Sequence, residues 1–478
     1  MSSPESAFSS LFKEIDGLKE HFITRLSKAV SIPSVSSDLT LRPKVVEMAH
    51  FLKSELTALG AAVELRELGP QPDAPDTQLP PIVLARYGVD TSKRTILVYG
   101  HYDVQPALIE DGWATEPFEL VQKDDKMYGR GSTDDKGPVM GWINSIEAHQ
   151  KAGIEFPVNL IMCFEGMEEY GSEGLDDLIF AEKDKFFKDA DAVCISDNYW
   201  LGTTKPVLTY GLRGCSYYSV TVEGPAADLH SGVFGGMVSE PMIDLVHILS
   251  GLVSPDGKIL VPGLMDLVAP VTEEESKTYD TIEYEMNDLY AATGAKTNLH
   301  DDVKRTLMAR WRYPTLSLHG VEGAFSAPGA KTVIPAKVTG KFSIRTVPDM
   351  QPHDVDELVF AHVNDLFTKL GSKNKMEIKL LHDGKWWLSS PSHWNFEAAK
   401  KATKTVWGVD PDLTREGGSI PVTLSFEQAT GKNVLLLPVG RGDDGAHSIN
   451  EKLDISNYIE GVKTLSAYLH YVAVEKME

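Results

Sequence analysis

The sequence predicts an α/β protein in which helices flank a central mixed β-sheet and a second, α+β domain is inserted into the chain. Short apolar segments alternate with segments of helical periodicity over the first 200 residues and again over the last hundred. Near-continuous apolar strands of this kind are typical of sheets that are buried on both faces. The middle of the chain instead has strands that alternate apolar and polar residues. We therefore expect a first domain in two parts, residues 1–210 and 381–478, around an inserted domain, residues 211–380.

The first part begins with two expected helices. Apolar residues from Phe8 to Val30 recur at three- and four-residue spacing, which predicts one helix that ends before Ile32-Pro33. Pro43 suits the first turn of a second helix that ends at Gly60. A proline-rich segment over residues 71–81 is expected to be a loop. The elements expected after it are strands over 82–86, 95–99, 158–164 and 192–196 and a helix over 136–152.

The inserted domain and the last part complete the prediction. In the middle of the chain we expect strands over 216–222, 316–319 and 337–344, with a helix over 241–252. A buried strand over 434–437 and a closing helix over 455–472 return to the first pattern.

Composition excludes several classes of function. The 478 residues include 46 Lys and Arg against 69 Asp and Glu, a net charge of −23, which argues against nucleic acid or an anionic membrane as the main partner. No apolar run is long enough to span a bilayer, and no secretory signal is visible at the N-terminus. Three cysteines give neither a disulfide framework nor a zinc knuckle, so we expect a cytoplasmic protein with Cys163 and Cys194 in the core.

The residues most indicative of chemistry follow the expected strands. Four strand ends and one helix start deliver carboxylates or imidazoles to what we expect to be one edge of the sheet: His101, Asp103, Asp134, Asp135, Glu168, Glu169, Asp197, Asp443, Asp444 and His447. So many carboxylates would repel one another without cations, and a pair of divalent metals is the natural counter-charge. Oxygen and imidazole ligands suit Zn²⁺, Mn²⁺ or Co²⁺ better than a calcium site.

Each of these signals has an ordinary structural explanation when taken alone. A histidine and an aspartate at a strand end are usually a polar loop, Asp-Asp before a helix is usually an N-cap, and Glu-Glu is usually a solvated pair. Their joint placement favours a site with two metals, in which one carboxylate bridges the ions. Glu168 beside Glu169 would then supply a free general base next to a ligand.

Longer motifs make the sequence resemble a known family. They include Gly-His101-Tyr-Asp103-Val-Gln-Pro, Gly-Arg-Gly-Ser-Thr-Asp134-Asp135-Lys-Gly-Pro, Phe-Glu-Gly-Met-Glu168-Glu169, Cys-Ile-Ser-Asp197-Asn-Tyr-Trp, Asp-Leu-His230-Ser-Gly, Thr-Arg-Glu416-Gly-Gly-Ser419-Ile-Pro and Gly-Asp-Asp-Gly-Ala-His447-Ser. Over essentially the whole chain the sequence resembles the M20 metallopeptidases, in their carnosinase-like branch.

The resemblance implies two divalent metal ions per subunit, Zn²⁺ or Mn²⁺, bound by five residues. His101 and Asp197 would bind one ion, Glu169 and His447 the other, and Asp134 would bridge them, with a cis peptide after it. Asp103 resembles the acid that orients a metal-ligating histidine.

The remaining roles are implied in the same way. Glu168 matches the general base. The inserted domain resembles a lid and dimerisation domain, whose His230 reaches the partner subunit's active site in a homodimer. Arg345 matches the arginine that binds the substrate carboxylate, and four further residues match the substrate pocket: Thr332, His382, Glu416 and Ser419.

The expected activity is that of a dipeptidase. The family resemblance implies hydrolysis of Cys-Gly and other dipeptides by a water that the metals activate, with a place in glutathione degradation. An N-acyl-amino-acid deacylase or aminopeptidase of the same superfamily is the alternative enzyme. A catalytically inactive scaffold is the alternative of a different class, although the retained motif residues argue against it.

Overall fold

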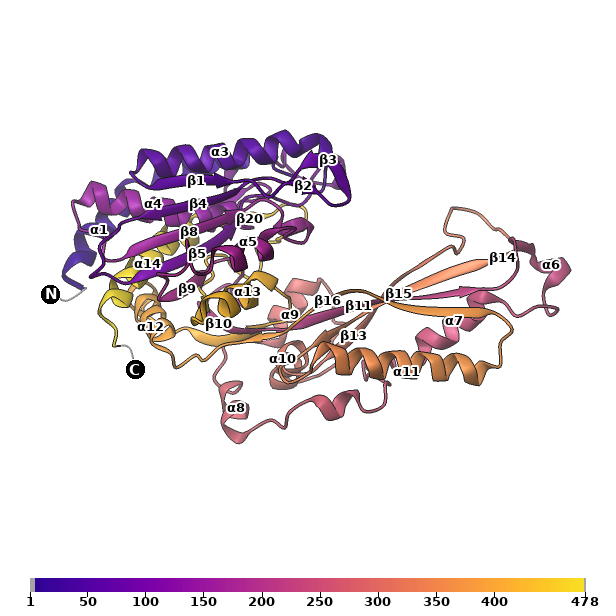
Figure 1. The fold of residues 1–478 in the computed structure, drawn as a ribbon. Helices are drawn as coiled ribbons and strands as arrows, with labels where there is room; N and C mark the ends of the chain where they lie inside the picture. The colour runs from indigo at the N-terminus through magenta and orange to yellow at the C-terminus, as the bar shows by residue number, and fades with distance from the viewer. Residues whose placement is uncertain (1–4, 477–478) are drawn as a thin grey trace. The chain divides into compact units, whose positions relative to one another are not determined.

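The structure, a computed structural model, describes residues 5–476, which divide into two compact units. The first unit contains residues up to 210, 389–414 and 422 onward, and the second contains residues 211–388 and 415–421. Relative to the expected inserted domain, the second unit extends to Leu388 and also takes the short segment around Glu416. Mixed α/β architecture with helices around a central sheet is as predicted (Figure 1).

A large mixed sheet forms the centre of the first unit. Its order is β1-β4-β8-β5-β9-β19-β10-β17, and β18 pairs with β10. The strands are β1 (Ala62–Arg66), β4 (Ile82–Tyr87), β8 (Asn159–Glu165), β5 (Thr95–His101), β9 (Ala192–Ile195), β19 (Val434–Leu436), β10 (Val207–Leu212), β17 (Trp387–Leu388) and β18 (Asp412–Glu416). The neighbours β8, β5, β9 and β19 are parallel, so their carboxyl ends lie at one edge.

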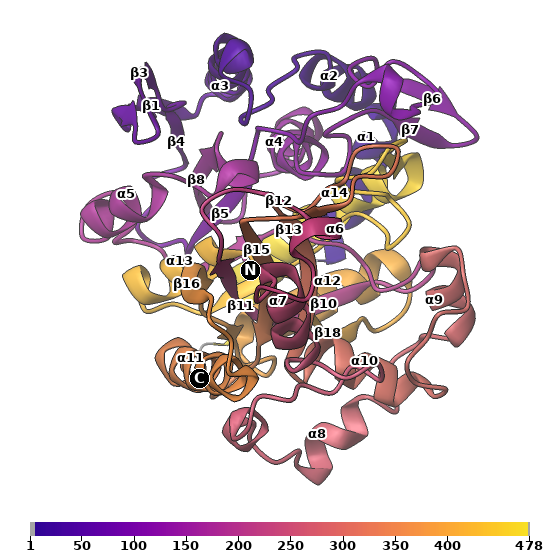
Figure 2. The same cartoon turned by 90° about the vertical axis from the view of Figure 1, so that its right-hand side faces the viewer.

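Helices cover both faces of this sheet. The side chains of Ile96 and Val98 on β5 belong to a core formed with one set of helices, whereas Tyr99 contacts Phe426 on the opposite face. The helices of the first unit are α1 (Glu5–Gly17), α2 (Lys19–Val30), α3 (Arg42–Ala58), α4 (Lys136–Ala152), α5 (Leu175–Glu182), α12 (Trp394–Trp407), α13 (Pro421–Thr430) and α14 (Ile455–Val474). Figure 2 shows α3 and α4 on one side of the sheet and α5 and α13 on the other. Burial on both faces explains the continuous apolar strands.

Two details of the first unit differ from the prediction. The helix expected over residues 8–30 is divided at Leu18, next to Gly17, although its apolar spacing continues through the break. The proline-rich segment expected to be a loop contains the short paired strands β2 (Pro70–Gln71) and β3 (Ala74–Gln78).

A further small sheet joins β20 (Lys452–Asp454), β7 (Lys126–Tyr128) and β6 (Val121–Lys123). Cys163 and Cys194 are fully buried, as expected.

The second unit has its own antiparallel sheet and core. The order of this sheet is β13-β15-β11-β16, formed by β13 (Thr315–Glu322), β15 (Lys337–Thr346), β11 (Gly214–Glu223) and β16 (Lys375–Gly384). A second pair joins β12 (Leu229–His230) to β14 (Val333–Ile334). The helices are α6 (Ser231–Phe234), α7 (Pro241–Ser250), α8 (Glu273–Thr278), α9 (Met286–Thr293), α10 (Val303–Trp311) and α11 (Pro352–Leu370). Residues of α7 and α11 share a buried core with the sheet.

No helix within residues 5–476 combines the length and apolar character needed to cross a bilayer.

A buried histidine pair between α4 and α14 makes stability depend on pH. His149 Nδ1 donates to the carbonyl of Ser145 at 2.7 Å, so its neutral ring presents Nε2 as an acceptor to His470 Nε2 at 3.1 Å. Burial lowers the pKa of each histidine to about 4. The unfolded chain, in which histidine titrates near 6.5, therefore binds more protons below that pH.

We expect this pair to lower the free energy of unfolding as the pH falls from about 6.5 towards 4, by about 2 kcal/mol per histidine at most between pH 7 and pH 5. His149→Leu should be less stable than the natural protein at pH 7.5 but should lose less stability on acidification to pH 5. Urea unfolding curves at both values measure this difference. His353→Gln, at an exposed position, should keep the natural dependence, and an equally steep loss in His149→Leu would contradict the assignment.

Candidate metal centre and substrate residues

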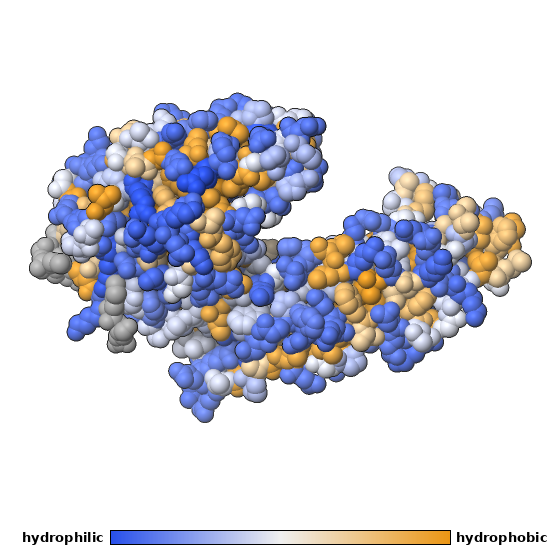
Figure 3. Space-filling view, viewed as in Figure 1, coloured by the Kyte–Doolittle hydropathy of each residue, from blue (hydrophilic) through white to orange (hydrophobic). Residues whose placement is uncertain are grey.

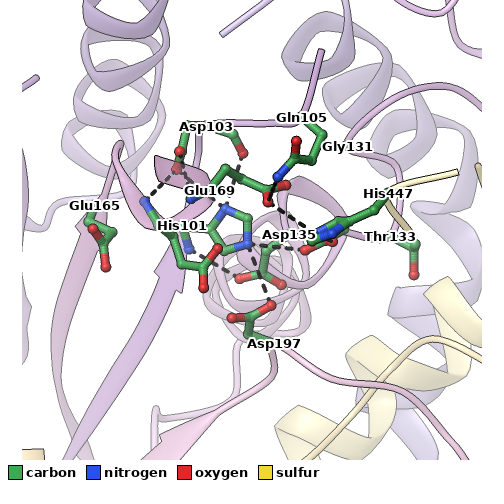
Figure 4. Close-up of polar contacts among 12 residues, drawn as sticks. His101, Asp103, Gln105, Gly131, Thr133, Asp135, Glu165, Glu169, Asp197 and His447 are labelled. Atoms are coloured by element: carbon green, nitrogen blue, oxygen red, sulfur yellow. Dashed lines mark hydrogen bonds and ion pairs between the residues drawn. The ribbon is translucent and has the colours of Figure 1, made fainter. Parts of the chain in front are cut away.

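The carboxyl edge of the first sheet gathers the predicted acids and histidines. His101 ends β5, Asp197 follows β9 by two residues, and His447 lies in the loop after β19. Glu168 and Glu169 begin the short 3₁₀ helix Glu168–Tyr170 that follows β8. Figure 4 shows His101, Glu169, Asp197 and His447 pointing toward one another. The parallel strand order therefore brings to one place residues that are far apart in sequence.

Asp134 lies between two groups of side chains and faces both. Its Oδ1 is 3.1 Å from His101 Nε2, which is also 3.5 Å from Asp197 Oδ1. Its Oδ2 is 3.1 Å from His447 Nε2, which is 3.0 Å from Glu169 Oε2. Each carboxylate oxygen of Asp134 thus belongs to a different group of three. The peptide between Asp134 and Asp135 is cis, as the family resemblance implied.

These distances fit metal coordination. Two ligand atoms at about 2.0–2.1 Å from a tetrahedral metal are about 3.3 Å apart. The separations of 3.0–3.5 Å between imidazole and carboxylate atoms agree with that value. Within each group of three, His101–Asp134–Asp197 and Asp134–Glu169–His447, one ligand atom per residue lies within 4.8 Å of the others.

The local electrostatics also favour bound cations. Hydrogen bonds to Asp134 and Glu169 raise the pKa of His447 to about 10. Burial opposes the charged form of His101, yet Asp197, Asp103 and Asp134 raise its pKa well above the usual value. The carboxylates therefore attract positive charge to both imidazoles, which must be neutral to bind a metal, so a cation would displace these protons.

Asp103 holds His101 and the two glutamates in position. Its carboxylate is fully buried and accepts hydrogen bonds from the backbone N–H groups of Glu168, at 3.2 Å, and Glu169, at 3.0 Å. His101 Nδ1 lies 3.1 Å from the backbone carbonyl of Asp103 and 3.4 Å from its side chain. A single acid therefore fixes one imidazole and the turn that carries the two glutamates.

Glu168 is an acid of this edge that belongs to neither three-residue group. Burial raises its pKa above the usual value, and although His101 acts in the opposite direction, the nearby carboxylates of Asp197, Glu169 and Asp103 raise it further. A divalent cation would oppose this effect and favour the ionised form. Glu168 thus has the placement and environment of a group that exchanges protons.

Asp443 and Asp444 have a different role from the one that their position after β19 suggested. Lys452 Nζ is 2.8 Å from Asp443 and 2.6 Å from Asp444, and it also contacts Asp454. Together with Arg441, which pairs with Asp454 at 3.1 Å, this ammonium group offsets most of the charge of the acidic cluster.

In the second unit, three predicted substrate residues lie close together. Arg345 donates to Ser419 Oγ at 3.0 Å, and Ser419 donates to the backbone carbonyl of Arg213 at 2.7 Å. Glu416, three residues before Ser419, pairs with Arg310 at 2.8 Å. Burial, together with nearby Arg345, lowers the pKa of Arg213 to about 10. The result is a cluster rich in guanidinium groups.

His230 and Thr332 form a second group in this unit. The backbone N–H of Ser231 donates to the carbonyl of Thr332, and β12 pairs with β14 directly beside it. The exposed ring of His230 accepts from Gly232 N–H at its Nδ1, which leaves Nε2–H as a donor. His382 is exposed on β16 opposite Tyr217 and has no hydrogen bond to either group among those found within residues 5–476.

Several partners at these sites carried no sequence signal. Arg213 and Arg310 lie beside the predicted substrate residues, and Glu451 accepts a hydrogen bond from the backbone N–H of Asp134. None of the three belongs to a recognisable spacing, although Arg213 directly follows β10, a strand that the sequence did not predict. A Glu-Lys pair after a loop is typical of a solvated turn, so only the folded contacts distinguish Glu451.

Comparison with known proteins identifies the family. The family model described as peptidase family M20/M25/M40 matches residues 97–471. The chain is 63% identical to the Cys-Gly metallodipeptidase of Schizosaccharomyces pombe over 97% of this chain and 98% of that one. It is 44% identical to the human Beta-Ala-His dipeptidase over 98% and 93% of the two chains.

Solved structures of dipeptidases have the same fold as this chain. A di-peptidase of Saccharomyces cerevisiae superposes with a TM-score of 0.90 at 59% identity, covering 98% of both chains. Human carnosine dipeptidase 1 also gives a TM-score of 0.90, at 43% identity and 98% coverage of both chains. The family match, the sequence identity and the paired metal-binding groups together lead to one conclusion: the chain belongs to peptidase family M20/M25/M40.

Proposed function

We propose that the protein is a metal-dependent dipeptidase that hydrolyses Cys-Gly and other dipeptides. The observation that carries the proposal is the arrangement of two three-residue groups on the two oxygens of Asp134. High identity to proteins named Cys-Gly metallodipeptidase supports the substrate. Cys-Gly is what remains of glutathione once its glutamyl group is removed, so we place the enzyme in glutathione degradation.

In this proposal His101 and Asp197 bind one divalent ion, Glu169 and His447 bind the other, and Asp134 bridges them. The donor set suits Zn²⁺ or Mn²⁺. Two such ions, when bound, polarise the scissile carbonyl and make water acidic enough to attack at neutral pH. Asp103 keeps His101 oriented and holds the turn of Glu168 and Glu169 in place.

Glu168 is the proposed general base. It takes a proton from the attacking water and transfers it to the leaving amine. His230, with its Nε2–H exposed, is the proposed donor to the oxyanion that forms on the carbonyl.

The second unit supplies the proposed substrate contacts. Arg345, with Ser419 held beside it, would bind the terminal carboxylate of the dipeptide, for which a guanidinium fork is well suited. Thr332, His382 and Glu416 are proposed to complete the pocket. Glu416, which pairs with Arg310, is the candidate for the terminal ammonium group of the dipeptide, as Arg345 is for its carboxylate.

We propose a cytoplasmic homodimer in which His230 acts in the partner's site. All three cysteines are free, which suits a reducing compartment. Around α6 and α7 several apolar side chains are exposed: Val233, Phe234, Met237, Val238, Ile243 and Val246. Figure 3 shows hydrophobic surface at that end of the second unit. Exposed apolar patches of this kind are typical of protein interfaces.

The activity test uses protein freed of metal by a chelator. Cys-Gly hydrolysis should be absent in this protein and should return when Zn²⁺ or Mn²⁺ is added separately, since both groups of ligands need a cation. N-acetyl-Cys-Gly is the matched substrate without a free amine and should remain intact. Cleavage of the blocked substrate instead would show a deacylase, and two bound ions without either activity would show a different substrate.

Glu168→Gln tests the general base. The variant should bind metal as the natural protein does but should lose about 10²–10⁴-fold in kcat, because an amide cannot accept the proton. Metal content and steady-state rates measure the two effects separately. Glu173→Gln, in the exposed part of the same loop, is the matched control and should remain active. Undiminished turnover by metal-loaded Glu168→Gln would disprove the role.

Mixed dimers test whether His230 acts in the partner's site. His230→Ala and Asp134→Ala should each be inactive alone, whereas a heterodimer of the two contains one complete site and should regain about half of the natural activity per dimer. Pairing His230→Ala with a chain carrying both changes leaves no complete site and is the control. Confirmed heterodimers that stay inactive would place His230 outside the partner's site.

A further inference from the structure

The loop that carries Asp134 is held to the loop that carries His447 by a buried carboxylate, that of Glu451. Glu451 Oε1 accepts from the backbone N–H groups of Thr133, at 3.0 Å, and Asp134, at 3.1 Å. Its Oε2 accepts from Gly131 N–H at 3.0 Å and from Arg130 at 2.8 Å. The side chain is fully buried, so four hydrogen bonds and no solvent surround it.

The same contacts extend toward His447. Arg130 donates through its other terminal nitrogen to the carbonyl of Ser448, the residue after His447. The backbone carbonyl of Glu451 accepts from Gly129 N–H at 2.9 Å, where β20 begins to pair with β7. Arg130 and Glu451 therefore connect the backbone next to Asp134 with the backbone next to His447, two members of the Asp134–Glu169–His447 group.

A parallel connection runs through Lys452 and Asp444. Lys452 Nζ holds one oxygen of Asp444, and the other oxygen accepts from Thr133 Oγ1 at 2.8 Å. A Cβ on Gly440 would lie 2.5 Å from Thr133 Oγ1 and 2.6 Å from Asp444 Oδ2, so the loops also approach too closely for a side chain there. Consecutive residues, Glu451 and Lys452, thus fix the two loops against each other.

We propose that Glu451 is a positioning residue that sets the separation of Asp134 and His447 and thereby the affinity of the Asp134–Glu169–His447 group for its ion. This inference rests on the two-ion site proposed above. Asp134 belongs to both groups, and His101 Nε2 lies 3.1 Å from its Oδ1, but His101 and Asp197 come from β5 and from the segment after β9 and have no hydrogen bond to Arg130 or Glu451 among those found within residues 5–476. The ion of the other group should therefore depend less on Glu451.

Metal titration of the chelator-treated, full-length protein tests this inference. Glu451→Gln keeps the shape of the side chain but replaces one carboxylate oxygen by an NH₂ group. That NH₂ group would face N–H donors and could not accept their hydrogen bonds. We expect its second Mn²⁺ or Zn²⁺ to bind about 10–100-fold more weakly, as is typical when a partner of a metal ligand is removed, with a smaller change for the first ion. Calorimetry measures both affinities, and Mn²⁺ electron paramagnetic resonance distinguishes a coupled pair of ions from single ones.

A matched control separates positioning from stability. Glu147 is likewise a buried glutamate that pairs with an arginine, Arg25, at 2.6 Å, but it lies away from the site on α4. Glu147→Gln should lower the unfolding temperature while keeping both metal affinities. Arg130→Lys has a single amine that cannot bond both Glu451 and the carbonyl of Ser448, so it should weaken the second ion less than Glu451→Gln does. It provides the measurement if Glu451→Gln fails to fold.

The outcomes distinguish this inference from the proposal on which it depends. Two ions bound with natural affinity by Glu451→Gln, or by Arg130→Lys where the first variant does not fold, would overturn the positioning role alone. Binding of a single ion by the natural protein would overturn the two-ion site and this inference together.

Discussion

The central physical constraint is the repulsion among carboxylates that the parallel strands bring to one edge. Asp103, Asp134, Glu169 and Asp197 are all nearly buried there, where unpaired charge is costly. Two kinds of group offset this repulsion. Backbone N–H groups donate hydrogen bonds to Asp103, and the imidazoles of His101 and His447 have raised pKa values that favour their positively charged form. Divalent cations are the remaining counter-charge, and the geometry around Asp134 offers each of them three ligand atoms.

Much of this edge was predictable because strand order determines where residues meet. Buried apolar strands identified β5, β8, β9 and β19 in sequence, and parallel neighbours must place their carboxyl ends together. The residues at or just after the ends of those strands, such as His101 and Asp197, therefore lie near one another, whereas the position of His447 also depends on its loop. The division at Leu18 could not be predicted, because the apolar spacing that identifies a helix continues across the break.

Residues that act through backbone contacts were not predictable for a related reason. Glu451 and Arg213 each bind main-chain groups of a segment distant in sequence, so no spacing links them to what they hold. The pairing of Asp443 and Asp444 with Lys452 shows the opposite error, since acids after a strand also serve to fix a loop. Only the folded contacts separate a ligand from a residue that positions ligands.

The second unit presents the opposite charge problem. Arg213, Arg310 and Arg345 lie around one carboxylate, that of Glu416, in a chain whose net charge is −23. Burial lowers the pKa of Arg213, and repulsion from Arg345 and Arg310 lowers it further, whereas Glu416 acts in the opposite direction. Three guanidinium groups against one carboxylate leave the cluster with an unbalanced positive charge. A free substrate carboxylate would balance it, whereas a blocked C-terminus would not. In the function proposed above, selectivity for short peptides with a free C-terminus would therefore follow from electrostatics in this unit, separately from the chemistry at the metal-binding groups.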